Sequence, residues 1–259
     1  MNQEKRILVC EDSMEGIFSA VYDGWKECAD GCKVSIQTSF PVNMELFTSY
    51  REIATDQSKA GKVMRTILMR LGSEVYEQIC LAAASADEDR GTAIYYVLHR
   101  AFGGGRCEKR VMEALADPYV SRVAKLALCV KREYHHYFGF VRFREISGRF
   151  LLAKIQPWND ILSLMAFHFS NRFPNENWVI YDEKRQKALC HEKGKECVMR
   201  KGVRIQVSGN AVGDMGEYEE LWQTFCDSIF IEAGRNEKLQ KQMLALHFRS
   251  NMPEFSMKG

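Results

Sequence analysis

The sequence predicts an α+β protein with a helical N-terminal half that contains a short strand pair, followed by a C-terminal antiparallel sheet covered by helices. Apolar residues recur at helical spacing from residue 58 to about residue 138. The pattern then switches to an alternating one at residues 140–145, with Val141 and Phe143 on one face and Arg142 and Arg144 on the other, which is typical of a half-buried strand. Hydrophobic residues at 46% and charged residues at 27% are ordinary values for a globular protein.

The first sixty residues predict two short strands on either side of one helix. Residues 6–10 form an apolar run, and residues 33–37 resemble a second strand. Between them, apolar residues at helical spacing from Met14 to Trp25 predict a helix, with Asp12 or Ser13 as its cap.

The middle of the chain predicts a series of helices. Gly72 separates two helical segments, and a run of glycines at 103–105 ends a third. Asp117 followed by Pro118 predicts the capped start of a long helix that reaches Tyr134.

Strand patterns dominate from residue 140. Residues 140–145 and 149–155 are expected to form a hairpin, and Asn159 or Asp160 is expected to cap the next helix. Because strands are grouped with helices between them, we predict an antiparallel sheet and place the domains at residues 1–131 and 132–259. Further strands are expected at 178–181, 187–191, 197–200 and 203–207, and helices at 217–232 and 236–248.

Several classes of protein are excluded by simple counts. The nine cysteines are odd in number and scattered, and no secretory segment precedes them, so we expect free thiols and a cytoplasmic protein. No apolar run approaches the roughly 18 residues that span a bilayer. No metal site and no cofactor are predicted, since dinucleotide, P-loop and zinc motifs are missing. The oligomeric state stays open.

Positive charge is concentrated near the middle of the chain. Residues 100–154 carry twelve basic and five acidic side chains, enough to neutralise several phosphates if the charges meet on one face. Arg142 and Arg144 would share a strand face, with Arg172 and Arg185 as further phosphate ligands. Tyr137 and Phe140 would offer surfaces on which bases stack. The alternative is a solvated helix surface, with Arg185 in a salt bridge to Asp182 inside a turn.

Three polar side chains are candidates for acid–base or metal chemistry. His135, His168 and Asp182 would act on a nucleotide or a damaged base if folding brings them into one cleft. The alternative for His168 is a place in the core, because it projects onto the apolar side of its helix.

Several motifs resemble a bacterial family of DNA metabolism or DNA repair proteins. They include Arg132-Glu133-Tyr134-His135, Gly139-Phe140-Val141-Arg142-Phe143, Pro157, His168-Phe169, Arg172-Phe173-Pro174 and Trp178-x-Ile180-x-Asp182-x-x-Arg185. The closing motif of the family resembles Trp222, Arg235-Asn236 and His247-Phe248-Arg249 of this sequence. The family's amino-terminal signature resembles Asp12-Ser13-x-x-Gly16. The sequence departs from the family at Leu244, where proline is expected, and at residues 247–249, where a Tyr-Trp-Lys-like triplet is expected.

The resemblance implies a protein that works with a radical S-adenosylmethionine (SAM) partner in DNA repair or modification. It also implies a C-terminal domain of unknown function similar to one that is fused to uracil-DNA glycosylases. It carries over no catalytic residue. The recurring polar positions of the family fall on Glu133, His135, Arg142, His168, Arg172, Asp182, Arg185, Arg235 and Asn236.

Three functional hypotheses follow. The first is an accessory component of DNA repair that binds nucleic acid, with DNA and a radical SAM protein as partners. The second is an enzyme acting on a nucleotide or damaged base. The third is a protein-interaction module without nucleic-acid affinity.

Overall fold

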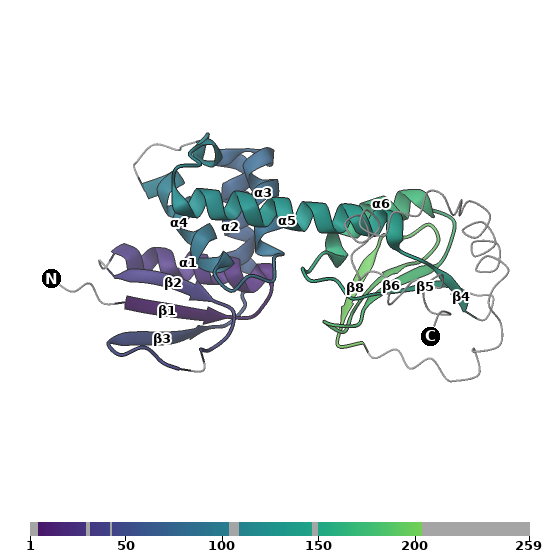
Figure 1. Ribbon diagram of the computed structural model, residues 1–259, viewed down its shortest axis with the longest axis horizontal. Helices are drawn as coiled ribbons and strands as arrows, with labels where there is room; N and C mark the ends of the chain where they lie inside the picture. Colours follow the sequence, from purple (N-terminus) through teal and green to yellow (C-terminus); the bar gives the residue numbers. More distant parts are fainter. Residues whose placement is uncertain (1–4, 30–31, 42, 104–108, 147–149, 204–259) are drawn as a thin grey trace, which may run out of the picture. The chain divides into compact units, whose positions relative to one another are not determined.

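The computed structural model describes residues 5–29, 32–41, 43–103, 109–146 and 150–203, and it divides the chain into two compact units (Figure 1). Unit 1 is Met1–Arg132 and unit 2 is Glu133–Gly259. Unit 1 holds β1 (Lys5–Cys10), α1 (Met14–Ala29), β2 (Lys33–Gln37), β3 (Thr48–Ile53), α2 (Gln57–Leu71), α3 (Ser73–Ala83), α4 (Arg90–Gly103) and a short 3-10 helix (Val111–Glu113). Helix α5 (Pro118–Phe140) contains the division, and unit 2 continues with β4 (Arg144–Ile146), β5 (Phe150–Ile155), α6 (Leu162–Arg172), β6 (Trp178–Asp182), β7 (Lys187–His191) and β8 (Val198–Lys201).

The sheet of unit 1 is parallel and has three strands, in the order β2-β1-β3. The predicted strand pair is therefore incomplete. Strand β3 escaped prediction because its sequence, TSYREI, has too few apolar residues for a buried strand. The parallel direction of β1 and β2 follows from α1, because a helix between two neighbouring strands returns the chain to the starting edge of the sheet.

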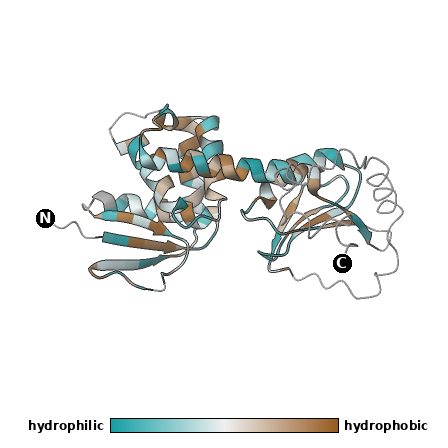
Figure 2. Cartoon of the chain, viewed as in Figure 1, coloured by the Kyte–Doolittle hydropathy of each residue, from teal (hydrophilic) through white to brown (hydrophobic). Residues whose placement is uncertain are grey.

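Helices α1 to α4 enclose one large hydrophobic core with this sheet. Ile17 and Phe18 of α1 are fully buried against Leu8 of β1. In Figure 2, β1 changes from hydrophilic to hydrophobic along its length, in keeping with its sequence KRILVC. The two caps predicted in unit 1 are present: the Ser13 hydroxyl accepts the Gly16 N–H at 3.1 Å, and the Asp117 carboxylate accepts the Tyr119 N–H at 2.8 Å.

The sheet of unit 2 is mixed, so the prediction of a purely antiparallel sheet is wrong in one place. The strand order is β4-β5-β6-β7-β8, and every pair is antiparallel except β5 with β6. Helix α6 connects these two strands and forces the parallel direction. Its residues Met165 and Phe169 are buried, and the Phe169 ring lies 6.2 Å from the fully buried ring of Trp178.

Helix α5 ends later than predicted, at Phe140. The N–H of Val141 still donates to the carbonyl of Tyr137 at 3.0 Å, so residues 140–143 do not form a strand, and β4 is only three residues long. Phe143 nevertheless packs inward, with its ring 5.5 Å from that of Phe169. The helices expected at 217–232 and 236–248, and most of the strand at 203–207, lie outside the described residues.

Two further findings concern the described residues alone. None of their helices combines the length and apolar character that a membrane span requires. Six of the cysteines lie there as free thiols, and burial raises the pKa of Cys10 to about 12.

Two glycines provide a matched test of the core of unit 1. A Cβ at Gly91 of α4 would lie 2.7 Å from Cγ2 of Ile36, which is fully buried, whereas a Cβ at Gly61 of α2 would meet nothing within 4 Å. We therefore expect Gly91→Ala to destabilise the protein by about 1–3 kcal/mol through overpacking. Gly61→Ala should stabilise it by about 0.5–1 kcal/mol, because glycine is costly inside a helix. Urea denaturation followed by circular dichroism measures both, and a stability for Gly91→Ala equal to that of the wild type would contradict the close approach of α4 to β2.

Candidate functional site

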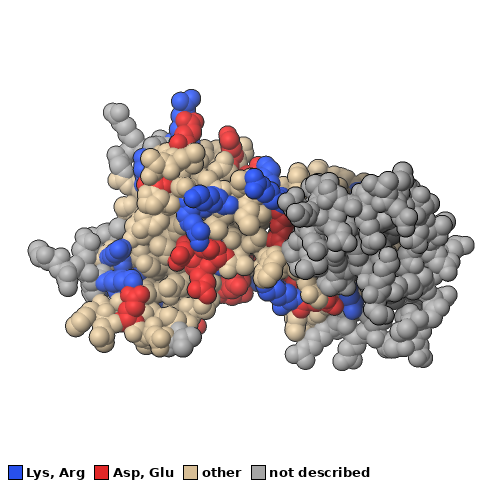
Figure 3. Space-filling model, viewed as in Figure 1, with Lys and Arg blue, Asp and Glu red and all other residues tan. Residues whose placement is uncertain are grey.

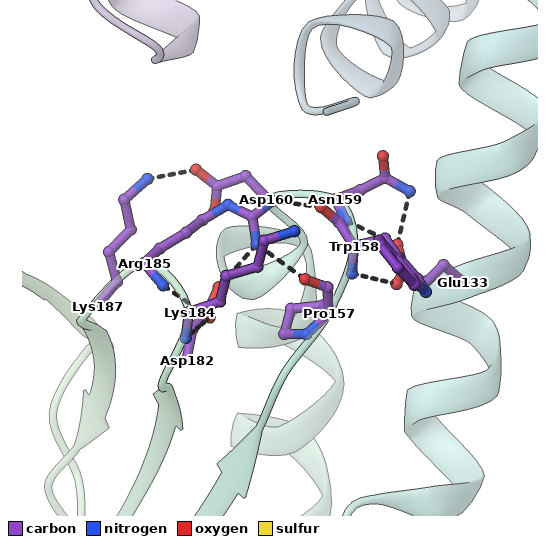
Figure 4. Close-up of polar contacts among 9 residues, drawn as sticks. All are labelled: Glu133, Pro157, Trp158, Asn159, Asp160, Asp182, Lys184, Arg185 and Lys187. Atoms are coloured by element: carbon purple, nitrogen blue, oxygen red, sulfur yellow. Dashed lines mark hydrogen bonds and ion pairs between the residues drawn. The ribbon is translucent and has the colours of Figure 1, made fainter. Parts of the chain in front are cut away.

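Polar side chains gather where the two parallel strands β5 and β6 end (Figure 4). The loop 156–161 follows β5, and the turn 183–186 follows β6. Carboxyl ends of neighbouring parallel strands lie at one edge of a sheet, and this edge is where α/β proteins commonly bind ligands. Three of the recurring family positions lie at this edge or contact it: Glu133, Asp182 and Arg185.

Glu133 of α5 fixes the loop from one side. Its carboxylate is buried, with 8% of the residue exposed, and accepts three hydrogen bonds. Oε1 accepts the Trp158 N–H at 2.7 Å, and Oε2 accepts the backbone N–H of Asn159 at 3.0 Å and its side-chain amide at 2.6 Å. The Asn159 side chain is therefore engaged by Glu133, and neither Asn159 nor Asp160 caps α6, whose cap residue is Ile161 without a side-chain hydrogen bond.

Arg185 fixes the same loop from the other side. Its guanidinium donates to the carbonyl oxygens of Pro157, at 3.1 Å, and of Trp158. It also forms an ion pair with Asp182 at 3.1 Å, so the turn salt bridge considered for these two residues is present. Asp182 is fully buried, and its Oδ1 accepts the N–H groups of Lys184 and Arg185 at 3.0 and 3.1 Å. Burial raises the pKa of Asp182, with the Arg185 hydrogen bonds and charge acting in the opposite direction.

These contacts hold residues 157–160, which we call the Trp158 loop, by the backbone. The buried Glu133 carboxylate binds two of its amides, and the half-buried Arg185 guanidinium, which is paired with Asp182, binds two of its carbonyls. An ion pair joins Asp160 to Lys187 (Figure 4). The side chain of Trp158 is 60% exposed, and the ammonium of Lys184 lies 5.1 Å from its ring centroid. An exposed aromatic ring on a fixed backbone, with a cation beside it, is suited to stacking on another π-system.

A second cluster joins α5 to α6. The ring of Phe138 stacks on His168 with centroids 3.9 Å apart and planes 10° apart, and His135 lies 5.6 Å from Phe138. Burial lowers the pKa of His168, and the charges of Arg172 and His135 lower it further. Within the described part of the chain, Nε2 of His168 is buried without a hydrogen-bond partner.

The predicted acid–base residues are thus only partly brought together. His135 and His168 share the Phe138 ring, but Asp182 makes its contacts with Arg185 and the following turn. Over the described ranges, no group of three or more His, Cys, Asp or Glu side chains is arranged to hold a metal ion.

The residues predicted to bind nucleic acid lie in different environments. The Tyr137 ring is 4% exposed, and burial raises its pKa, so it does not present the stacking surface expected of it. Phe140 ends α5 half-buried instead of lying on a strand. The guanidinium of Arg142 donates to the carbonyl of Gly139 at 2.8 Å, which caps the end of the helix.

The other predicted phosphate ligands differ in exposure. Arg144 and Arg172 are exposed, whereas the guanidinium of Arg185 donates to the backbone of the Trp158 loop. Arg235 and Asn236 lie outside the described residues.

Ion pairs neutralise part of the positive charge of the basic segment 100–154. Five of its side chains form ion pairs with carboxylates, and on the face shown in Figure 3 basic groups are interspersed with acidic ones. These ion pairs therefore neutralise part of the charge on which the expectation of one continuous basic surface rests. The pairs are Arg100–Asp117, Arg110–Glu113, Arg122–Asp87, Lys131–Glu77 and Lys154–Glu183.

Sequence reasoning missed Trp158 and Asn159 as site residues. The sequence did offer one signal, because a tryptophan follows directly after Pro157, which ends the strand. The segment around it is polar and has no apolar periodicity, so nothing in the pattern places this large side chain in the core. What no pattern reveals is that the acceptor for this loop comes from Glu133, 25 residues earlier.

Removing the Glu133 carboxylate should destabilise the protein strongly. Glu133→Ala leaves the N–H groups of Trp158 and Asn159 without their acceptor, and each unsatisfied buried donor costs about 1–3 kcal/mol. Glu77→Ala is the matched control, because this glutamate is exposed and its ion pair with Lys131 contributes about 0–1 kcal/mol. Thermal unfolding measures both variants, and equal melting temperatures would contradict the role of Glu133.

His168 should make the folded protein sensitive to acid. Its folded pKa lies below the ordinary value of 6.5, so the unfolded chain takes up the proton first as the pH falls. Stability is therefore lost as the pH falls below about 6.5, until the folded pKa is passed. We expect His168→Gln to show a smaller drop in melting temperature between pH 7.5 and 5.5 than the wild type. His136→Gln, at an exposed position of α5, controls for loss of an imidazole, and an unchanged drop in His168→Gln would refute the effect.

Comparison with known proteins gives one match. A family model described as a domain of unknown function, DUF4130, matches residues 88–254, which is more than half of the chain. No curated protein and no solved structure matches the chain. The match includes Glu133, the Trp158 loop, Asp182 and Arg185, whereas α1 to α3 precede it. The chain therefore belongs to the family of the domain of unknown function DUF4130.

Proposed function

We propose that the chain is an accessory protein of DNA repair or DNA metabolism, which binds nucleic acid and works with a radical SAM partner. The observation that carries the nucleic-acid part of the proposal is the exposed Trp158 ring on its fixed loop. The DNA-repair setting and the partner rest on the motifs that resemble a DNA repair family, including Glu133, His168, Arg172, Asp182 and Arg185.

The Trp158 loop supports binding of single-stranded regions. A tryptophan ring stacks on any unpaired base, and one such contact contributes about 1–3 kcal/mol. Because Glu133 and Arg185 already fix the backbone, little conformational entropy is lost when a base stacks on the ring. Duplex bases are already stacked on their neighbours, so a gap, flap or damaged position is the expected target.

Two exposed cations of unit 2, one of them beside the Trp158 loop, support contacts with phosphates. Lys184 lies beside the Trp158 ring and forms no ion pair within the described residues. Arg172, at the end of α6, is exposed, with its guanidinium 5.6 Å from the Phe173 ring centroid. These two side chains replace the continuous basic surface as the phosphate ligands of the proposal.

The enzyme hypothesis receives less support from the geometry. It required His135, His168 and Asp182 in one cleft, and Asp182 is instead buried in its ion pair with Arg185. The interaction-module hypothesis predicts binding to the partner with no affinity for nucleic acid, so the experiment below separates it from the proposal.

Replacing Trp158 should weaken binding of single-stranded DNA. Loss of one stacked base predicts about a 5- to 150-fold rise in Kd for Trp158→Ala, at unchanged salt dependence. The measurement is fluorescence anisotropy with a labelled oligonucleotide, across a salt series and with the radical SAM protein absent or present. Phe167→Ala is the control, because Phe167 is an exposed ring of α6 outside the loop.

No affinity at low salt, or equal affinity of Trp158→Ala and the wild type, would remove the nucleic-acid part of the proposal. Failure of the two proteins to associate in a pull-down would remove the partner.

A further inference from the structure

Unit 1 contains a groove of about 480 Å³ that belongs to neither cluster of unit 2. Helices α1, α2 and α4 form it, and we call it the aromatic groove. From this groove we infer a binding site for a nucleotide unit, meaning a planar base that carries a phosphate. Its characteristic lining residues are Tyr22, Trp25, Lys26, Lys62, Arg70 and Phe102.

The walls of the groove are aromatic and its floor is aliphatic. The Trp25 ring lies 6.2 Å from Phe102, at 65°, so two rings meet at an angle on one side. Trp25 is 37% exposed and the side chain of Phe102 is half-buried, whereas Ile67 and Leu98 are fully or almost fully buried beneath them. A planar apolar ligand therefore finds rings to stack on and aliphatic side chains below.

Cations surround the same space. The ammonium groups of Lys26 and Lys62 lie 5.5 and 5.8 Å from the Tyr22 ring centroid, and the Arg70 guanidinium lies 5.6 Å from that of Phe102. No carboxylate is among the lining residues. Lys26 and Lys62 form no ion pair with any described residue, unlike neighbouring Lys59, which binds Asp23 at 2.8 and 2.9 Å.

This combination determines the class of ligand. A purely apolar ligand would leave the ammonium groups unused, and inorganic phosphate would leave the rings unused. A nucleotide satisfies both, with the base against Trp25 and Phe102 and the phosphate near Lys26 and Lys62. The volume lies within the 300–1,000 Å³ that small-ligand pockets commonly have.

The inference does not depend on the proposed function. Except for Leu98 and Phe102, the lining residues precede the region that the family model matches, and the Trp158 loop lies in the other unit. A free nucleotide and one nucleotide within a strand both carry a planar base and a phosphate. The experiment below distinguishes these two sources.

Isothermal titration calorimetry of the full chain tests the site with AMP, adenosine, inorganic phosphate and a ten-residue single strand. We expect AMP to bind, adenosine and phosphate to bind more weakly, and the variant Lys26→Ala plus Lys62→Ala to lose at least about tenfold in AMP affinity. Lys125→Ala, an exposed lysine of α5 outside the groove, is the control. Circular dichroism checks that each variant folds.

Equal AMP binding in the wild type and the double variant, or no AMP binding at millimolar concentration, would overturn the site. Tighter binding of the strand than of AMP, lost in the double variant, would assign the groove to a nucleotide within a strand. Equal affinity would assign it to free nucleotides. Trp158→Ala should leave AMP binding unchanged, which keeps this test separate from that of the Trp158 loop.

Discussion

The C-terminal unit depends on one buried carboxylate that must find hydrogen-bond donors. Glu133 lies on the inner side of α5, where an unpaired charge would be very unfavourable, and it obtains its three donors from the Trp158 loop. The ion pair of Asp182 and Arg185 then holds the carbonyls of the same loop. The end of α5, the edge of the sheet and the start of α6 are thereby fixed to one another by polar contacts.

Local patterns in the sequence predicted most helices and strands but not their directions. The segments at 6–10, 14–25 and 33–37 follow β1, α1 and β2 closely, because apolar periodicity reflects burial directly. A helix between two such strands already implies a parallel pair, and this applies to α6 between β5 and β6 as well. Helix α5 passed its predicted end because hydrogen bonding continues through Gly139, where composition alone indicated a strand.

The sequence identified several residues of the candidate site, but it did not predict what their side chains do. Glu133, Asp182 and Arg185 were identified from the family resemblance, yet the structure uses them to hold a loop rather than to face a ligand. Tyr137 was expected to offer a stacking surface, but it lies on the buried face of α5. Which carboxylate pairs with which cation is a long-range property, so the ion pairs that divide the basic segment could not be inferred from charge counts.

Glu133 and Arg185 both hold residue 158 by its main chain. Glu133 binds its amide and Arg185 its carbonyl, so these two contacts do not depend on which side chain this position carries. A substitution at this position keeps both contacts, so the anchoring of the loop is separable from the stacking proposed for the ring. A reporter group attached at this position would leave both main-chain contacts in place.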